Sequence, residues 1–105
     1  MNTIVKTDLE AIYHNLSTTE KNKFNKSTFL ITGAAGFLGY YTILFLDTFA
    51  NQLGIDHIIA IDNFKFGKPQ WIKRIEKKPI FSVIDRDITT LDIQKQIIFS
   101  VDYII

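Results

Sequence analysis

The sequence of 105 residues contains no cysteine, which excludes disulfides, thiolate metal sites and a cysteine nucleophile. Histidine is also scarce, because His14 and His57 are far apart and create no zinc-type ligand spacing. We therefore expect no metal site and no thiol chemistry. A cytoplasmic location is permitted, although the absence of cysteine fits any compartment.

The sequence also lacks a segment that reads as a leader or a membrane span. Residues 1–10 carry charged side chains and no apolar core, so no signal peptide is expected. The uncharged run from Ser27 to Leu46 has the length of a membrane span, but three glycines interrupt it. A buried strand, a turn and a buried helix explain this run better, and we expect no membrane partner.

Cationic side chains concentrate in residues 65–78, which hold six lysines and arginines against Glu76 alone. This segment carries a net charge of +5, which leaves −4 for the rest of the chain. A nucleic-acid-binding domain usually spreads its basic excess over a whole face. A solvated helix face is the simpler interpretation, and no nucleic-acid partner is expected.

The first part of the chain predicts a short amphipathic helix over residues 8–16. Apolar side chains recur there at helical spacing, and Thr7 with Glu10 matches the capping-box pattern. Residues 17–27 are polar without an apolar period, and they are predicted to be a linker. We therefore assign residues 1–26 to an N-terminal helix and linker, and residues 27–105 to the domain that follows.

Strands and helices alternate in that second part. Continuous β-prone runs predict buried strands at residues 28–32, 58–61, 80–84 and 103–105. Apolar stripes predict helices at residues 37–51, 69–78 and 91–99. This β-α-β-α-β-α-β order predicts an α/β fold with a parallel sheet and right-handed crossovers. Because the sequence stops on three apolar residues of a predicted strand, we expect the N-terminal piece of a longer protein.

Gly33, Gly36 and Gly39 follow the first predicted strand at G-x-x-G-x-x-G spacing. We expect Gly33 to turn the chain off the strand, Gly36 to let a pyrophosphate approach the backbone, and Gly39 to let the helix pack tightly on the sheet. The helix N-terminus would offer free N–H groups and partial positive charge to the phosphates. Between a buried strand and an apolar helix, this spacing predicts a partial Rossmann fold that binds a dinucleotide. The alternative is a glycine-rich turn without a ligand.

Asp62 ends the second predicted strand, 23 residues after Gly39. A carboxylate there can accept hydrogen bonds from both hydroxyls of an adenosine ribose and would repel a 2′-phosphate, which favours NAD over NADP. Lys65 weakens that argument, because a cation could hold the phosphate. The alternative for Asp62 is a strand-ending turn with Asn63.

Four segments in order resemble a known family: FLITGAAGFLG, IDNFKFGK, RDIT and VDYII. They are similar to the N-terminal half of the extended short-chain dehydrogenases, the NAD-dependent epimerase/dehydratase family that acts on nucleotide sugars. The likeness is to its UDP-glucuronate decarboxylases and dTDP-glucose 4,6-dehydratase-like enzymes. It covers residues 27–105, and the leading helix also looks like an N-terminal extension of some bacterial members.

The resemblance implies roles for nine residues. The pyrophosphate loop matches Gly33, Gly36, Phe37 and Leu38; the ribose contacts and their neighbour match Asp62, Asn63 and Lys65; the pair at the adenine edge matches Asp87 and Ile88. From chemistry alone, an aspartate at position 87 is more often a turn or a helix cap. The resemblance further implies NAD as cofactor, a nucleotide-sugar substrate, a cytoplasmic location and a homodimer.

The family's catalytic Tyr-x-x-x-Lys lies further along its sequence. None of the four tyrosines here has a lysine four residues later, so we expect no catalytic residue among these 105. The chain would then be the NAD-binding portion of a dehydratase, decarboxylase or epimerase. Two alternatives remain open. One is a non-catalytic Rossmann module that senses NAD, which a downstream Tyr-x-x-x-Lys would argue against. The other is a flavodoxin-like or interaction domain, which failure to bind any dinucleotide would favour.

Overall fold

The computed structural model describes residues 3–86 and 101–105. Its elements in chain order are α1 (Thr3–Asn15), α2 (Thr18–Phe24), β1 (Thr28–Thr32), α3 (Phe37–Thr48), α4 (Ala50–Leu53), β2 (His57–Asp62), α5 (Gln70–Ile75), β3 (Phe81–Asp85) and β4 (Tyr103–Ile104). The predicted α/β class is confirmed, and strand and helix alternate from β1 to β3. The helix predicted near residues 91–99 lies outside the described residues.

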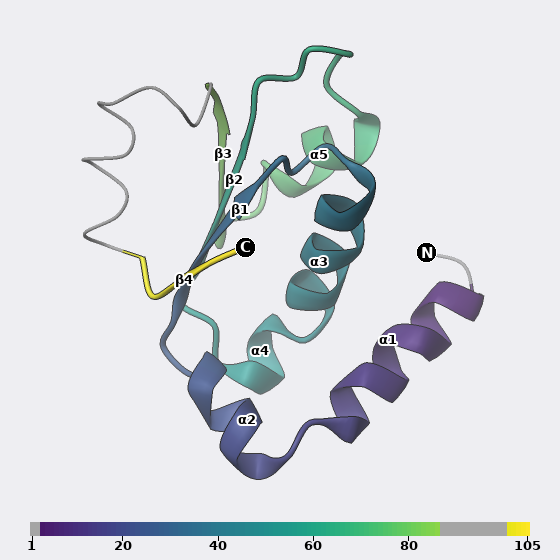
Figure 1. Ribbon diagram of the computed structural model, residues 1–105, viewed down its shortest axis with the longest axis vertical. Helices are drawn as coiled ribbons and strands as arrows, with labels where there is room; N and C mark the ends of the chain where they lie inside the picture. The colour runs from purple at the N-terminus through teal and green to yellow at the C-terminus, as the bar shows by residue number, and fades with distance from the viewer. Residues whose placement is uncertain (1–2, 87–100) are drawn as a thin grey trace.

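The four strands form one parallel sheet in the order β3-β2-β1-β4 (Figure 1). Leu30 in the middle of β1 pairs with Ile59 of β2 on one side and with Ile104 of β4 on the other. Because the strands are parallel, their carboxyl ends meet at one edge of the sheet. The loops that follow β1 and β2 therefore leave the sheet side by side.

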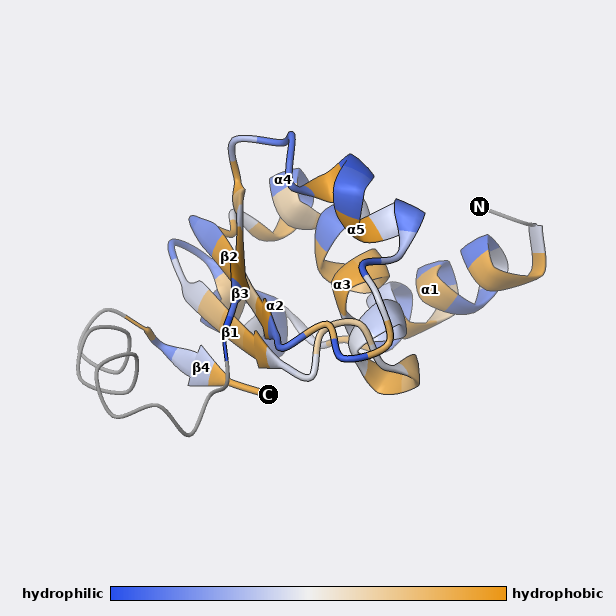
Figure 2. Ribbon diagram, turned by 90° about the horizontal axis from the view of Figure 1, so that it is seen from above, coloured by the Kyte–Doolittle hydropathy of each residue, from blue (hydrophilic) through white to orange (hydrophobic). Residues whose placement is uncertain are grey.

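The main core lies between the sheet and the helices on one face, where Figure 1 shows α3 and α5. Alternation along β1 sends Phe29 and Ile31 to this core, whereas Leu30 packs with Ile61 on the opposite face. A strand that is buried on both faces has a continuous run of apolar residues in its sequence. Figure 2 shows β1 and β2 as largely hydrophobic, in agreement with this rule. This explains why the sequence located these strands well.

Helix α1 begins earlier than predicted, and the expected capping box at Thr7 is wrong. Thr7 lies inside the helix, where its hydroxyl donates a hydrogen bond to the carbonyl of Thr3 at 2.8 Å. Val5, the first residue of the predicted apolar stripe, lies inside the helix and packs against the core. Leu9 is 3% exposed in the same core cluster, and Tyr13 stacks on Phe49 at 4.4 Å. The helix thus shares the core of the sheet domain.

Residues 17–27, which were predicted as a polar linker, contain a helix that was not predicted, α2. Ser17 caps this helix: its Oγ accepts from the Glu20 amide at 3.1 Å, and the Ser17 amide donates to Glu20 Oε1 at 2.9 Å. The backbone and side-chain bonds with Ser17 lower the pKa of Glu20 below its usual value. The Ser-x-x-Glu signal was therefore present in the sequence, and the scarcity of apolar residues hid it.

We expect the Ser17→Ala variant to lose about 0.5–2 kcal/mol of unfolding free energy, because an unsatisfied helix N-terminus replaces the cap. Urea denaturation measures this loss. Part of this loss should depend on pH, because the Ser17 side chain is, after the Ser17 backbone, the second cause that lowers the pKa of Glu20; that part should be present above the unfolded-state pKa of Glu20 and be lost as the pH falls through its lowered folded-state pKa. Thr7→Ala is the matched control and should be close to neutral. Equal losses in the two variants would contradict the cap assignment.

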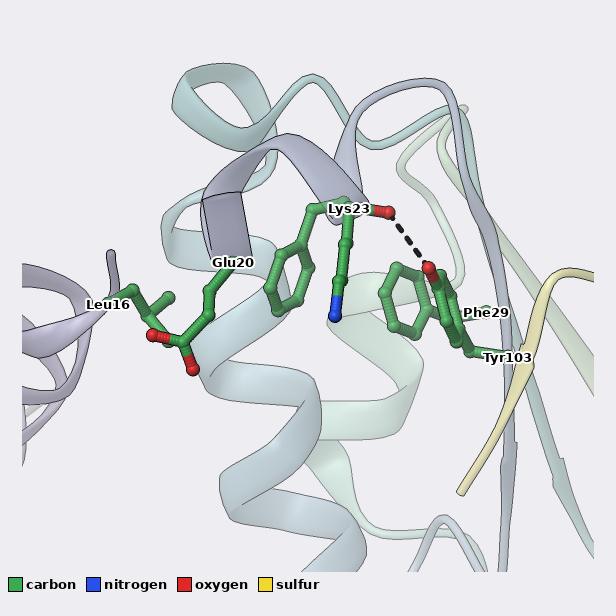
Figure 3. Close-up of a pocket in the computed structure, with 6 residues that line it drawn as sticks. Leu16, Glu20, Lys23, Phe29 and Tyr103 are labelled. Atoms are coloured by element: carbon green, nitrogen blue, oxygen red, sulfur yellow. Dashed lines mark hydrogen bonds between the residues drawn. The ribbon is translucent and has the colours of Figure 1, made fainter. Parts of the chain in front are cut away.

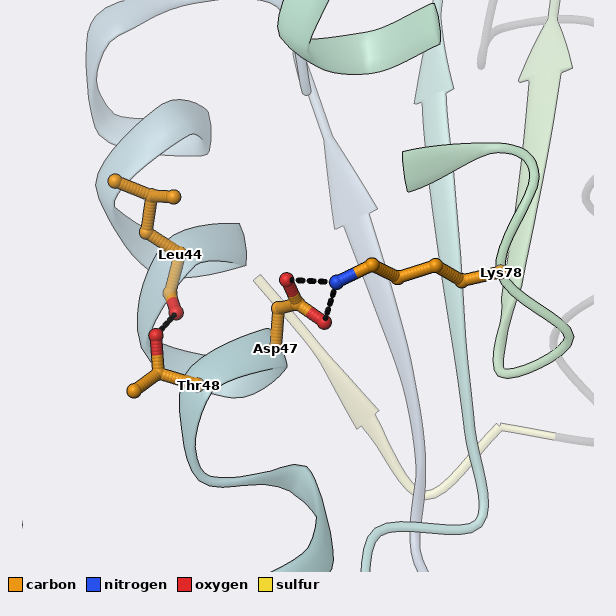
Figure 4. A network of polar contacts seen from close by, with 4 residues as sticks. All are labelled: Leu44, Asp47, Thr48 and Lys78. Atoms are coloured by element: carbon orange, nitrogen blue, oxygen red, sulfur yellow. Dashed lines mark hydrogen bonds and ion pairs between the residues drawn. The ribbon is translucent and has the colours of Figure 1, made fainter. Parts of the chain in front are cut away.

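Two ion pairs hold part of the basic segment. Lys78 Nζ lies 2.8 Å from Asp47 of α3, and Figure 4 shows it reaching across from the turn after α5. Lys68 pairs with Glu76 at 3.0 Å. The side chains of both pairs are partly exposed, so each pair contributes at most about 1 kcal/mol. Lys73 and two further cations, Arg74 and Lys77, are exposed on and just after α5, which agrees with the solvated face predicted.

The uncharged run from Ser27 to Leu46 forms β1, a turn and most of α3, as predicted. Its length is therefore divided between a strand and a helix. None of the helices in the described part of the chain is long and apolar enough to cross a membrane.

Candidate functional site

A pocket of about 460 Å³ lies at the carboxyl edge of the sheet, between the loops that follow β1 and β2. Five predicted site residues line it: Gly33, Gly36, Asp62, Asn63 and Lys65. The structure thus brings together two groups that are well separated in sequence. Phe37 and Leu38 follow directly at the start of α3, whereas Asp87 and Ile88 lie outside the described residues.

The loop after β1 turns at Gly33, whose φ is +60°. Only glycine adopts this left-handed conformation without steric cost, so the predicted turning role of Gly33 is confirmed. The Gly36 amide donates to the Gly33 carbonyl at 3.0 Å, and the Ala34 amide donates to the Ile61 carbonyl at 3.1 Å. These bonds fold the loop back against β2 and set the position of Gly36.

Gly39 lies where α3 presses on this loop. A Cβ at this position would lie 2.5 Å from the carbonyl oxygen of Ala34 and 2.7 Å from that of Gly33. Both distances are well below van der Waals contact with fixed backbone atoms. The structure thus confirms that Gly39 allows a close approach of the helix, but the contacting surface is the backbone of the glycine loop and not the sheet that was predicted.

Helix α3 begins directly at the pocket. Gly36 is its N-cap residue, with extended backbone at φ −79° and ψ 178°, and no side chain caps the helix. The amides of the first helical turn have no intrahelical acceptor, and they carry the positive end of the helix dipole. An anionic group beside Gly36 would therefore meet both N–H donors and a favourable field.

Asp62 connects the two loops through its side chain. Its Oδ2 accepts a hydrogen bond from the Ala35 amide at 3.1 Å, and its Oδ1 accepts one from the Phe64 amide at 2.7 Å. Asn63 makes a similar local turn, because its Oδ1 accepts from the Lys65 amide at 3.0 Å. The strand-ending turn considered as the alternative role of Asp62 is therefore present. An ionised carboxylate has about four acceptor positions, so two remain for other donors.

The loop after β2 carries an exposed aromatic side chain that was not predicted from the sequence. Phe66 is 97% exposed although its loop is tightly turned, with φ +51° at Phe64 and +95° at Gly67. The Gly67 amide donates to the Phe64 carbonyl at 2.9 Å and closes this turn. Phe37 and Leu38 at the start of α3 are also about three-quarters exposed. Of these three side chains, Phe66 lines the pocket and is therefore available to a ligand there.

A smaller pocket of about 280 Å³ lies between α2, β1 and β4 (Figure 3). It sits near the amino ends of the strands, where Phe29 stacks on Tyr103 at 5.2 Å. The Tyr103 hydroxyl donates to the Lys23 carbonyl at 3.2 Å, as Figure 3 shows. These contacts attach β4 to α2, and no predicted site residue lines this pocket.

Comparisons with family models, with curated proteins and with solved structures gave no match for this chain. Within residues 3–86 and 101–105, no group of three or more histidine or acidic side chains is placed to hold a metal ion. The polar groups of the larger pocket are thus backbone amides, one helix terminus, the carboxylate of Asp62, the carboxamide of Asn63 and the ammonium group of Lys65.

Proposed function

We propose that the chain binds NAD in the pocket between its glycine loop and the loop after β2. The observation that carries this proposal is that Asp62 lines the same pocket as Gly36, the N-cap of α3, where no side chain caps the helix. Rossmann folds place the pyrophosphate at such a helix N-terminus and the ribose at such an acid. The sheet order β3-β2-β1-β4 supports the proposal, because it is the strand order of the first part of that fold.

The proposed pose assigns one chemical task to each wall of the pocket. The pyrophosphate would lie against Gly36 and the first amides of α3, where the absence of a side chain leaves the backbone accessible. The adenosine ribose would donate its hydroxyls to the remaining acceptor positions of Asp62. Phe37 and Leu38 would cover the cofactor with apolar surface and exclude water from the phosphates. Asp87 and Ile88 remain predicted contacts of the adenine.

The reaction class follows from the family resemblance. We propose the cofactor-binding portion of a nucleotide-sugar dehydratase, decarboxylase or epimerase, in which bound NAD accepts and returns a hydride. Proton abstraction from the sugar would need the family's Tyr-x-x-x-Lys motif, which this sequence of 105 residues does not contain. The residues described here would bind and orient the cofactor. A module that binds NAD without catalysis would use the same pocket.

We expect calorimetry to show that the chain binds NAD at least about ten-fold more tightly than NADP, a difference of about 1.4 kcal/mol. The physical reason is repulsion between the Asp62 carboxylate and a 2′-phosphate. Lys65→Ala is the informative companion variant, because Lys65 lines the same pocket and could hold that phosphate. The preference for NAD should persist in this variant.

Two results would contradict these expectations, one for the role of Asp62 in selecting NAD and one for the binding of NAD itself. Equal affinity for the two cofactors would remove Asp62 as the selecting group. Failure to bind either dinucleotide would overturn the proposed function and favour an interaction domain.

A further inference from the structure

We propose that the Asp62 carboxylate is a positioning group. It holds the two walls of the larger pocket, which are the glycine loop after β1 and the loop after β2, in place before any ligand enters. This inference concerns the ligand-free chain and holds whatever the pocket binds. A mutation at Asp62 could weaken binding in two ways. It could remove a contact with the ligand, or it could disorder the two loops that form the pocket. The proposal concerns the second of these roles.

Asp62 is fixed through its backbone and bridges the two loops through its side chain. Its backbone carbonyl accepts from the Arg86 amide at 3.1 Å, so the residue is held at the edge between β2 and β3. From this position its two carboxylate oxygens reach in different directions, to Ala35 in the glycine loop and to Phe64 in the next loop. The Ala35 bond joins residues 27 positions apart in the sequence. It therefore fixes one loop relative to the other.

The chemistry of the bridge requires a carboxylate. Ionised aspartate presents two acceptor oxygens and no donor, which matches two backbone N–H groups. Asparagine is nearly the same size but offers one oxygen, and its NH₂ group would face an N–H donor. Hydrogen bonds to an ionised acceptor are also stronger than those between neutral groups. Asp62→Asn should therefore keep one of the two hydrogen bonds, either from the Ala35 amide or from the Phe64 amide, and lose the other.

A preassembled pocket changes how binding data should be interpreted. A ligand entering an ordered site avoids the cost of ordering the loops, and this raises affinity without any new contact. Loss of affinity in Asp62→Ala would then include disorder of the glycine loop as well as lost ribose contacts. The ligand-free chain is accordingly the right state in which to test the positioning role.

The test is residue-resolved amide hydrogen exchange on the ligand-free chain. It compares the unmodified chain with three variants, Asp62→Ala, Asp62→Asn and Asn63→Ala. In Asp62→Ala we expect the Ala35 and Phe64 amides to exchange about ten-fold faster, because each loses its acceptor. In Asp62→Asn only one of these two amides should accelerate. The Ala34 amide, which bonds to the backbone of Ile61, is the internal reference and should stay slow.

Asn63→Ala is the matched control, because it removes a local turn of the same type without a bond across the pocket. It should accelerate the Lys65 amide and leave Ala35 unchanged. Unchanged Ala35 exchange in Asp62→Ala would overturn the proposal, and so would equal acceleration of Ala34, which would indicate general unfolding. If Asp62→Ala does not fold, Asp62→Asn decides, and acceleration of both amides or of neither counts against the bridge. Failure to bind NAD would refute the proposed function and leave this result intact.

Discussion

Replacing Gly39 with alanine should lower the free energy of unfolding by about 2 kcal/mol, within the range of about 1–3 kcal/mol for overpacked sites. Alanine is ordinarily the better helix former, by about 1 kcal/mol, so propensity alone predicts the opposite sign. The added Cβ would lie 2.5 Å from the Ala34 carbonyl oxygen and 2.7 Å from that of Gly33. Neither atom belongs to a flexible side chain, so α3 or the whole loop must move.

Urea denaturation of Gly39→Ala measures this effect, with an unchanged m-value as the sign that the two end states are comparable. Gly36→Ala is the matched control, because its Cβ would meet only one atom, the Gly33 carbonyl oxygen at 3.3 Å. Its backbone is also in a region open to any residue, at φ −79°. Equal free energies of unfolding for the two variants would show that the close contact at Gly39 does not limit the stability of the chain.

The sequence predicted much of the sheet because burial leaves a strong signal there. Strands β1 and β2 are buried on both faces, and their runs of apolar residues differ clearly from the flanking glycine and polar residues. Helix α2 was not predicted because it has no buried residue. Its start is marked by a cap of two residues, and Phe24 at its end packs only partly buried against the core. A pattern based on apolar periodicity cannot detect such a helix.

At the site, the sequence identified the positions of the glycines better than the contacts of the acid. Glycine spacing reflects backbone geometry, which is local, so the turn at Gly33 and the close approach at Gly39 were predictable. The bond from Asp62 to the Ala35 amide depends on how two separate loops lie in space, and no spacing rule encodes it. The exposure of Phe66 is likewise a tertiary property. The resemblance pointed to Asp62 as a ligand contact and did not reveal its role as a bridge.

The second large effect is expected at Gly36, where valine should abolish NAD binding and leave the fold largely intact. The backbone of Gly36 is extended, with φ −79° and ψ 178°, and β-branched residues favour this conformation. The positive φ of the loop lies at Gly33, so backbone strain does not arise at Gly36. Its Cβ would need the Gly33 carbonyl to yield by only a few tenths of an ångström. The unfolding free energy should therefore change little.

The affinity for NAD should nevertheless fall at least about 100-fold in Gly36→Val, which corresponds to about 2.7 kcal/mol. Two methyl groups would occupy the space beside the first amides of α3, where the proposed pose puts the pyrophosphate. Each charge-assisted bond lost there is expected to cost about 1.5–3 kcal/mol. Calorimetry with NAD measures the affinity, and urea denaturation of the same sample shows that the fold is retained. Gly36→Ala should fall between parent and valine variant, because one methyl group obstructs the same space less. A folded Gly36→Val chain with an unchanged dissociation constant would show that the phosphates do not bind at the glycine loop.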